Sequence, residues 1–140
     1  MMCRILVVED SQIVREPLSR LLRSEGFQVI SAADGSDAME LLNDLEQPVD
    51  LVLLDVLMPR MDGVAFLTAM RSDARFRDLP VIGLTGVSDT GRLARLRELG
   101  VKEIVHKVRF TFDGLLEDIR RHLPTAAAAA AVVAAAVVPT

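Results

Sequence analysis

Five short runs of aliphatic residues recur along the chain, and between them apolar residues return at helical spacing. The aliphatic runs cover residues 3–8, 28–33, 50–55, 80–85 and 103–106. Nearly continuous apolar runs of this length are typical of parallel strands that are buried on both faces, with helices as the crossover connections. The pattern therefore predicts an α/β domain with a doubly wound parallel sheet, in which a helix follows each strand.

Turn-forming residues mark the ends of the predicted helices. Gly26 and Gly100 follow the first and the fourth helical stretch, where glycine favours the end of a helix. Pro17 lies inside the first helical stretch, which predicts either a local kink or a helix that begins later. Cys3 is the only cysteine, so no internal disulfide can form, and it is expected in the core near the start of the first strand.

Length and charge narrow the class of protein. The 140 residues suffice for one domain and a short appendage, and the net charge is −4. The arginines are scattered among acidic residues, and tryptophan and tyrosine are absent, so direct binding of nucleic acid is not expected. The first residues, MMCRILVV, enter a strand without the pattern of a signal peptide, which favours the cytoplasm.

The composition changes near the end of the chain. Residues 1–124 are predicted to form the domain, and residues 125–140 an Ala/Val-rich tail. As a helix, the apolar stretch 126–138 would span about 20 Å, less than the roughly 30 Å core of a bilayer, so no membrane span is expected. We interpret the tail as a linker or a vector-derived remnant; association of two chains through it, as a homodimer, stays open.

Polar residues stand at the carboxyl ends of the predicted strands. Glu9 and Asp10 follow the first strand, Asp55 ends the third, Thr85 ends the fourth, and Lys107 follows the fifth. In a parallel sheet these ends share one edge, which is where open α/β sheets place their chemistry. Three neighbouring carboxylates repel one another unless a cation lies among them, and Mg²⁺ prefers oxygen ligands. The sequence therefore predicts a Mg²⁺ site at this edge, with the lysine as a second source of positive charge.

The chain resembles the receiver domain of two-component response regulators over residues 3–123. The resemblance rests on four features in order: VVED (7–10), LLDVLMPRMDG (53–63), the threonine of GLTG (83–86), and Lys107 after the fifth strand. It implies a flavodoxin-like (βα)5 fold with strand order 2-1-3-4-5. It also implies a phosphorylation-dependent switch, in which Asp55 accepts a phosphoryl group from a sensor histidine kinase or a phosphotransfer protein.

The resemblance assigns a role to each residue of the site. The Mg²⁺ ligands would be Glu9, Asp10, Asp55 and the backbone carbonyl of Leu57. Thr85 and Lys107 would contact phosphoryl oxygens and carry the switch. A carboxylate can attack phosphorus to give an acyl phosphate, so the domain would catalyse its own phosphorylation and, more slowly, its own dephosphorylation, without being an enzyme for another substrate.

In receivers the switch reaches the surface formed by the fourth helix, the fifth strand and the fifth helix. A downstream effector is therefore expected on this face, which here includes Arg92, Arg95, Ile104, Phe112 and Leu116. Ile104 occupies the position where many receivers have a tyrosine or phenylalanine that turns inward on activation. An aliphatic residue cannot give the same rotamer change, so the output path is expected to differ.

A second departure leaves an alternative function open. Val108 follows Lys107, where the family usually has a proline in a cis bond; because a cis bond before another residue costs about 3 kcal/mol, a trans bond is expected. Val108 and Ile104 together keep open a pseudo-receiver, an interaction module that signals without phosphorylation. An aspartyl-phosphate phosphatase would need a second acid where Leu57 stands, and no G-x-G-x-x-G follows the first strand to bind a dinucleotide.

Overall fold

The computed structural model describes residues 3–44, 46–56, 63–86, 90–107 and 111–123. In chain order its elements are β1 (Arg4–Val8), α1 (Gln12–Ser24), β2 (Gln28–Ala32), α2 (Gly35–Leu42), β3 (Leu51–Asp55), α3 (Gly63–Arg71), the 3₁₀ helix η1 (Ala74–Phe76), β4 (Val81–Thr85), α4 (Thr90–Glu98), β5 (Glu103–His106) and α5 (Phe112–His122). The predicted alternation of strand and helix is confirmed.

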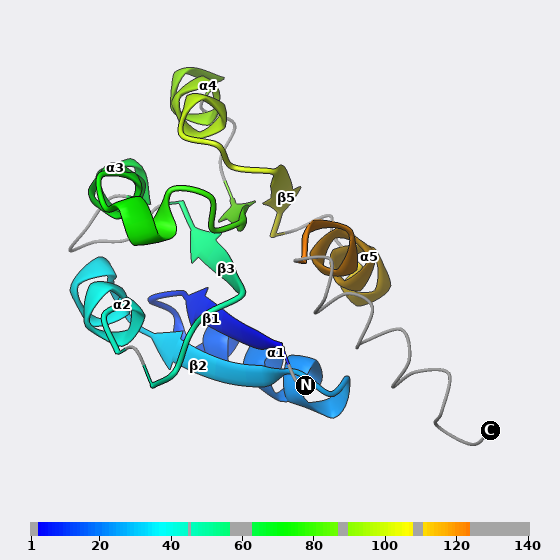
Figure 1. Cartoon of the computed structure of the whole chain (residues 1–140). Helices are drawn as coiled ribbons and strands as arrows, with labels where there is room; N and C mark the ends of the chain where they lie inside the picture. The colour runs from blue at the N-terminus through cyan, green and yellow to red at the C-terminus, as the bar shows by residue number, and fades with distance from the viewer. Residues whose placement is uncertain (1–2, 45, 57–62, 87–89, 108–110, 124–140) are drawn as a thin grey trace.

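The strands form one parallel sheet in the order β2-β1-β3-β4-β5 (Figure 1). This is the strand order that the resemblance implied, and the flavodoxin-like (βα)5 fold is confirmed. The register brings the ends of the strands level: Asp55 in β3 lies beside Leu84 in β4, and Thr85 lies beside His106 in β5. Strands β2 and β5 are the two edges of the sheet.

Alternating strand residues fill two cores on opposite faces of the sheet. Ile5 and Val7 pack with residues of α1 and α5, whereas Leu6 and Val8 pack with residues of α2, α3 and α4. Figure 1 shows the two groups of helices on either side of the sheet. Strands covered on both faces explain the uninterrupted apolar runs in the sequence. Cys3 is buried, as predicted.

The first helix begins before Pro17 and not after it. Helix α1 starts at Gln12 and runs through the exposed Pro17, so the predicted alternative of a later start is wrong. Gly26 and Gly100, which follow α1 and α4, have φ angles of 95° and 83°. This left-handed conformation is the usual end of a helix and explains the glycines there.

Three predictions fall on residues outside the described ranges: the carbonyl ligand of Leu57, the trans peptide bond before Val108, and the tail 125–140. The domain boundary at residue 124 also stays a prediction. Among the described residues, every helix is too short or too polar to cross a bilayer.

Arg71, the last residue of α3, connects the segment that follows it in the chain with the residue that follows α4. Its Nε donates to the carbonyl oxygen of Leu99 after α4 at 2.8 Å, and Nη1 donates to those of Phe76 and Leu79 at 2.8 and 2.7 Å. Burial lowers the pKa of the Arg71 guanidinium, against the charge of Asp78. The cation is therefore satisfied mainly by carbonyl dipoles, and its hydrogen bonds hold the connection before β4 against the connection between α4 and β5.

We expect Arg71→Met to lower the free energy of unfolding by about 2–3 kcal/mol, because several partly buried carbonyl groups lose a charged donor. Chemical denaturation monitored by circular dichroism measures the change. Arg97→Met is the matched control: Arg97 is exposed on α4, and its replacement is expected to change stability by less than about 0.5 kcal/mol. Equal effects of the two substitutions would contradict the role given to Arg71.

Candidate functional site

Backbone pairing extends past the strand ends and fixes the residues that follow them. The Glu9 N–H donates to the carbonyl of Ala32 after β1 at 3.1 Å, and the Lys107 N–H donates to the carbonyl of Thr85 after β5 at 2.8 Å. Because both bonds continue the sheet ladder, the two side chains start from fixed positions at the same edge. The predicted meeting of polar residues at this edge is therefore built into the strand register.

The side chain of Lys107 connects two acidic residues of different strands. Its Nζ lies 2.9 Å from Glu9 Oε2, 3.1 Å from Glu9 Oε1 and 3.2 Å from Asp55 Oδ2. Glu9 and Asp55 are almost completely buried, at 0% and 2% relative exposure. A buried carboxylate needs a partner of opposite charge, and the single ammonium group serves both. Thr85 is also buried, at 2% exposure, at the end of β4.

Three carboxylates gather around this lysine. One oxygen from each of Glu9, Asp10 and Asp55 lies within 4.8 Å of the others. Glu9 Oε2 is buried with the Lys107 ammonium 2.9 Å away, and a carboxylate oxygen with one such contact keeps a further lone pair for a cation. An all-oxygen donor set in which one acid, Asp10, is exposed suits Mg²⁺, which keeps several of its waters. The predicted ligand side chains thus lie together and could hold a divalent metal.

Burial and mutual repulsion set the protonation of this cluster. Burial, a hydrogen bond with Asp10 and the charge of Glu9 raise the pKa of Asp55 to about 7, against the opposing effect of Lys107. Burial also acts to raise the pKa of Asp10, but hydrogen bonds with Asp55 and Glu9 outweigh it and lower that pKa. The two aspartates therefore share a proton near neutral pH, which is what two adjacent carboxylates without a cation should do.

Burial alone would lower the pKa of Lys107. Its hydrogen bond and ion pairs with Glu9 and Asp55 outweigh that effect and raise the pKa above the ordinary value for lysine. The ammonium group therefore stays charged at neutral pH. It can offer a fixed positive charge to an anion at the Asp55 carboxylate.

Two further residues position the site, and neither was predicted to do so. Arg15 of α1 donates from Nη1 to the carbonyl oxygen of Glu9 at 2.8 Å and that of Asp10 at 3.3 Å, which fixes the loop after β1. A Cβ on Gly63 would lie 2.8 Å from the carbonyl oxygen of Val56, so the start of α3 can approach the residue after Asp55 only with glycine there. A helix arginine normally indicates a solvated face, so no signal distinguished Arg15.

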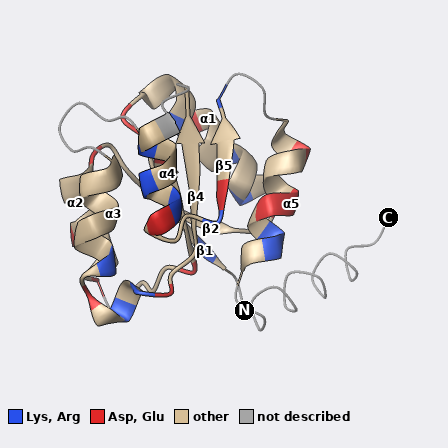
Figure 2. Ribbon diagram, turned by 90° about the horizontal axis from the view of Figure 1, so that it is seen from above, with Lys and Arg blue, Asp and Glu red and all other residues tan. Residues whose placement is uncertain are grey.

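The remaining predicted residues occupy other parts of the fold. Ile104 of β5 is half-buried against the core under α2, α3 and α4, away from the acidic edge. Phe112 is half-buried and packs against the opposite core. Helix α5 carries both acidic and basic segments (Figure 2).

Comparison with known proteins gives one consistent result. The family model described as the response regulator receiver domain matches residues 5–120. The chain is 30% identical to protein PilG of Pseudomonas aeruginosa over 122 residues, which cover 87% of this chain and 88% of PilG. Among solved structures, chemotaxis protein CheY4 of Vibrio cholerae has a TM-score of 0.80 at 28% identity, with 88% of this chain and 100% of CheY4 covered.

Other relatives are much longer than this chain. The CAI-1 autoinducer sensor kinase/phosphatase CqsS of Vibrio cholerae is 34% identical over 105 residues, which are 74% of this chain and 15% of CqsS. The chain also spans less than half of the length of several other curated relatives. The matching part is a segment of 98–127 residues that occurs in proteins of different length.

The shared proton makes the stability of the metal-free protein depend on pH. The pKa of Asp55 in the folded chain, about 7, lies above the value of about 4 in an unfolded chain, so the folded state keeps a proton between these values and its stability falls as pH rises through that window. In EDTA we expect Asp55→Asn to raise the free energy of unfolding at pH 8 by about 1–2 kcal/mol, allowing for solvent at the rim, and the gain to vanish toward pH 4.

Urea unfolding at pH 4, 6 and 8 measures this difference. Glu117→Gln is the matched control, because Glu117 is an exposed carboxylate of α5 and its loss of charge is expected to change stability by less than about 0.5 kcal/mol at any of these pH values. An Asp55→Asn protein that is no more stable than the parent at pH 8 would contradict the electrostatic account.

Proposed function

The chain belongs to the response regulator receiver family, and from this we propose that it is a phosphorylation-dependent signalling switch whose phosphoacceptor is Asp55. One observation carries the proposal: the buried Asp55 carboxylate lies 3.2 Å from the Lys107 ammonium at the edge of the sheet where three acidic side chains meet. A carboxylate in contact with a fixed positive charge is suited to react with an anionic phosphoryl group.

The chemistry follows from the residues at this edge. A carboxylate oxygen of Asp55 attacks the phosphorus of a phosphohistidine; an O–P bond forms, the N–P bond breaks, and the imidazole leaves with the electron pair of that bond. Lys107 offsets negative charge on the phosphoryl oxygens, and the Thr85 hydroxyl is the proposed hydrogen-bond donor to another of them. Slow hydrolysis of the acyl phosphate resets the switch. Asp55 reacts as the carboxylate, so the raised pKa must fall when a cation binds.

Magnesium is the cofactor that this donor set fits. Glu9, Asp10 and Asp55 would hold the ion, with the backbone carbonyl of Leu57 as a further ligand by family resemblance. When bound, Mg²⁺ supplies positive charge that offsets the three carboxylates and the phosphoryl oxygens. The ammonium group of Lys107 contributes from the β5 side of the cluster.

The proposed donor is a sensor histidine kinase or a phosphotransfer protein in the cytoplasm. Any protein donor must bring its phosphohistidine to Asp55 and so must cover the surface beside the acidic edge. Ile13, in the first turn of α1, is 86% exposed and lies three residues after Asp10. A large apolar side chain exposed to this degree at the rim of a reaction site is suited to bury itself in a partner. We propose it as an anchor for the donor.

The proposed output surface is formed by α4, β5 and α5. It combines the half-buried Ile104 and Phe112 with exposed charges such as Arg95, whose Nη1 pairs with Glu98 at 3.0 Å on α4. New contacts of Thr85 and Lys107 with a phosphoryl group would favour one of two packings of this face, which a downstream effector distinguishes. A pseudo-receiver would use the same face without phosphorylation, and the first experiment below separates the two.

Incubation with acetyl phosphate and Mg²⁺ is expected to add the mass of one phosphoryl group to the intact protein. Asp55→Asn should prevent the addition, and Lys107→Ala should slow it by about tenfold or more, because one fixed charge on the phosphoryl oxygens is lost. Asp37→Asn, a change to an exposed acid of α2, is the control and should react like the parent. The alternative is a folded parent protein that gains no phosphoryl group and whose amide NMR shifts do not change when beryllofluoride and Mg²⁺ are added. That result would identify a pseudo-receiver.

The anchor role of Ile13 separates protein donors from small ones. We expect Ile13→Asp to slow phosphoryl transfer from the cognate phosphoprotein by about tenfold, since an interface anchor of this size contributes about 1–2 kcal/mol, and to leave the rate with acetyl phosphate unchanged. Leu21→Asp is the matched control, because Leu21 is the other large apolar side chain exposed among the described residues and lies further along α1. Equal slowing with both donors would contradict a docking role.

A further inference from the structure

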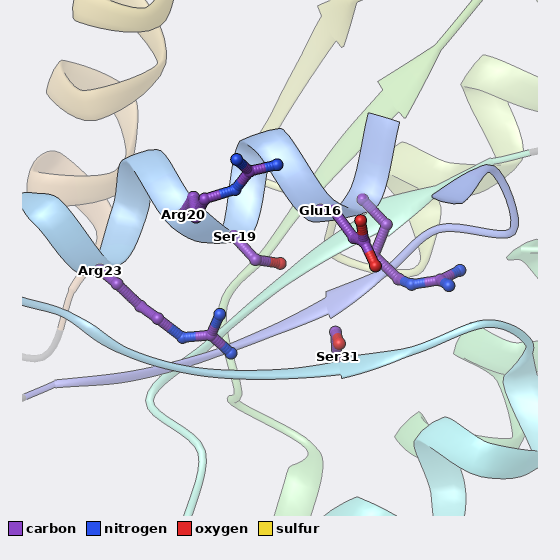
Figure 3. Close-up of a pocket in the computed structure, with 6 residues that line it drawn as sticks. Glu16, Ser19, Arg20, Arg23 and Ser31 are labelled. Atoms are coloured by element: carbon purple, nitrogen blue, oxygen red, sulfur yellow. The ribbon is translucent and has the colours of Figure 1, made fainter. Parts of the chain in front are cut away.

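A groove separate from the acidic edge runs between α1 and the edge strand β2. Its volume is about 380 Å³, and it is lined by Arg15, Glu16, Ser19, Arg20, Arg23 and Ser31. Figure 3 shows Ser19 and Arg23 extending from α1 toward β2, on which Ser31 lies. Of the lining side chains, the proposed function uses only Arg15, through its hydrogen bonds to the carbonyl oxygens of Glu9 and Asp10.

The charge of the groove is opposite to that of the whole chain. Three arginines and one glutamate line it, which gives a local charge of +2, whereas the net charge of the protein is −4. The single carboxylate, on Glu16, accepts a hydrogen bond from Gln12 of the same helix at 2.8 Å, so it already has one donor. A concave surface with this excess of positive charge attracts anions.

Ser19 provides the second, independent observation. Its side chain is only 3% exposed, and Oγ has no hydrogen-bond partner among the described residues, although Ser19 is one of the residues that line the groove. A buried hydroxyl without a partner costs about 1–3 kcal/mol, so such groups are rare unless something outside the chain satisfies them. A ligand in the groove would do so.

The arginines differ in what they can still donate. Arg15 already donates to the carbonyls of Glu9 and Asp10, so it contributes charge at a distance. Arg23 uses one group, Nη2, on the carbonyl of Val29 at 3.1 Å. Arg20 is exposed and makes no hydrogen bond or ion pair with any described residue. Arg20 and Arg23 therefore have N–H groups available for a ligand.

We propose that the groove between α1 and β2 binds the phosphate group of a small molecule. Donors come from both walls: Ser19, Arg20 and Arg23 on the helix, and the hydroxyl of Ser31 on the strand. A tetrahedral anion with three or four oxygens can accept hydrogen bonds from both walls at once, whereas a planar carboxylate reaches one wall. Guanidinium groups match phosphate oxygens with paired N–H donors, which favours phosphate further.

Binding is tested on the full chain in EDTA, so that magnesium-dependent binding at the acidic edge does not contribute. Inorganic phosphate, pyrophosphate and ADP are titrated separately, with acetate as the planar control, and calorimetry and amide NMR shifts are the readouts. We expect saturable binding of pyrophosphate with a Kd below about 1 mM, and shifts in residues 12–24 and 28–32. Tighter binding of ADP would identify a nucleotide as the source, and equal binding would identify free phosphates; both support the site.

Variants decide whether the groove itself binds. Arg20→Gln and Ser19→Ala should each weaken pyrophosphate binding by about fivefold or more, because each removes a donor to a charged group. Arg97→Gln, which makes the same charge change on α4, and Asp55→Asn should leave the Kd unchanged. The stability of Ser19→Ala should equal that of the parent, since the substitution removes a buried hydroxyl without a partner. Weaker binding by this variant would therefore reflect the lost donor and not unfolding. Binding that acetate matches, or that neither groove variant weakens, would overturn the proposal.

Discussion

The contact of one ammonium group with two buried carboxylates is the interaction on which the functional edge depends. Lys107 lies within 3.2 Å of both Glu9 and Asp55, and neither acid has substantial access to water. Without the lysine, two buried charges would have no counter-charge, which is among the most destabilising arrangements in a protein interior. With it, the cluster still carries an excess of negative charge. The fold therefore holds its acidic edge together and at the same time leaves it ready for a divalent cation.

Sheet register makes this arrangement precise enough for chemistry. The residues come from β1, β3, β4 and β5, and each leaves its strand at the same level because the ladder continues to Glu9 and Lys107. Side chains on rigid strand ends are held more exactly than side chains on loops. Arg15 and Gly63 then fix the two connections that leave the edge, one by hydrogen bonds to carbonyls and the other by close backbone approach. Strand order, rather than any local motif, thus assembles the site.

The same reasoning explains how far the sequence could predict the structure. Burial on both faces gives β1, β3 and β4 continuous aliphatic runs, and shorter aliphatic runs mark β2 and β5, so the fold class and the edge that carries Asp55 could be predicted. The contacts of long side chains could not. Arg71 reaches the carbonyl of Leu99, 28 positions away, and Arg15 turns back to the loop after β1, and many other rotamers would suit the same sequence spacing. The later start of α1 that Pro17 suggested is wrong, because the packing of α1 outweighs the loss of a single helix hydrogen bond.

The charge arithmetic of the cluster also indicates how a covalent change at Asp55 would reach the surface. A phosphoryl group replaces one carboxylate charge with about two and places them further from β3, so the balance point for the Lys107 ammonium moves away from Glu9. The backbone of Lys107 is held by Thr85, so movement of the ammonium must come from the side chain or from β4 and β5 together. Ile104 lies on β5 three residues earlier, half-buried, where a small displacement changes its packing. Electrostatic imbalance at the edge would thereby become a change in shape on the α4-β5-α5 face.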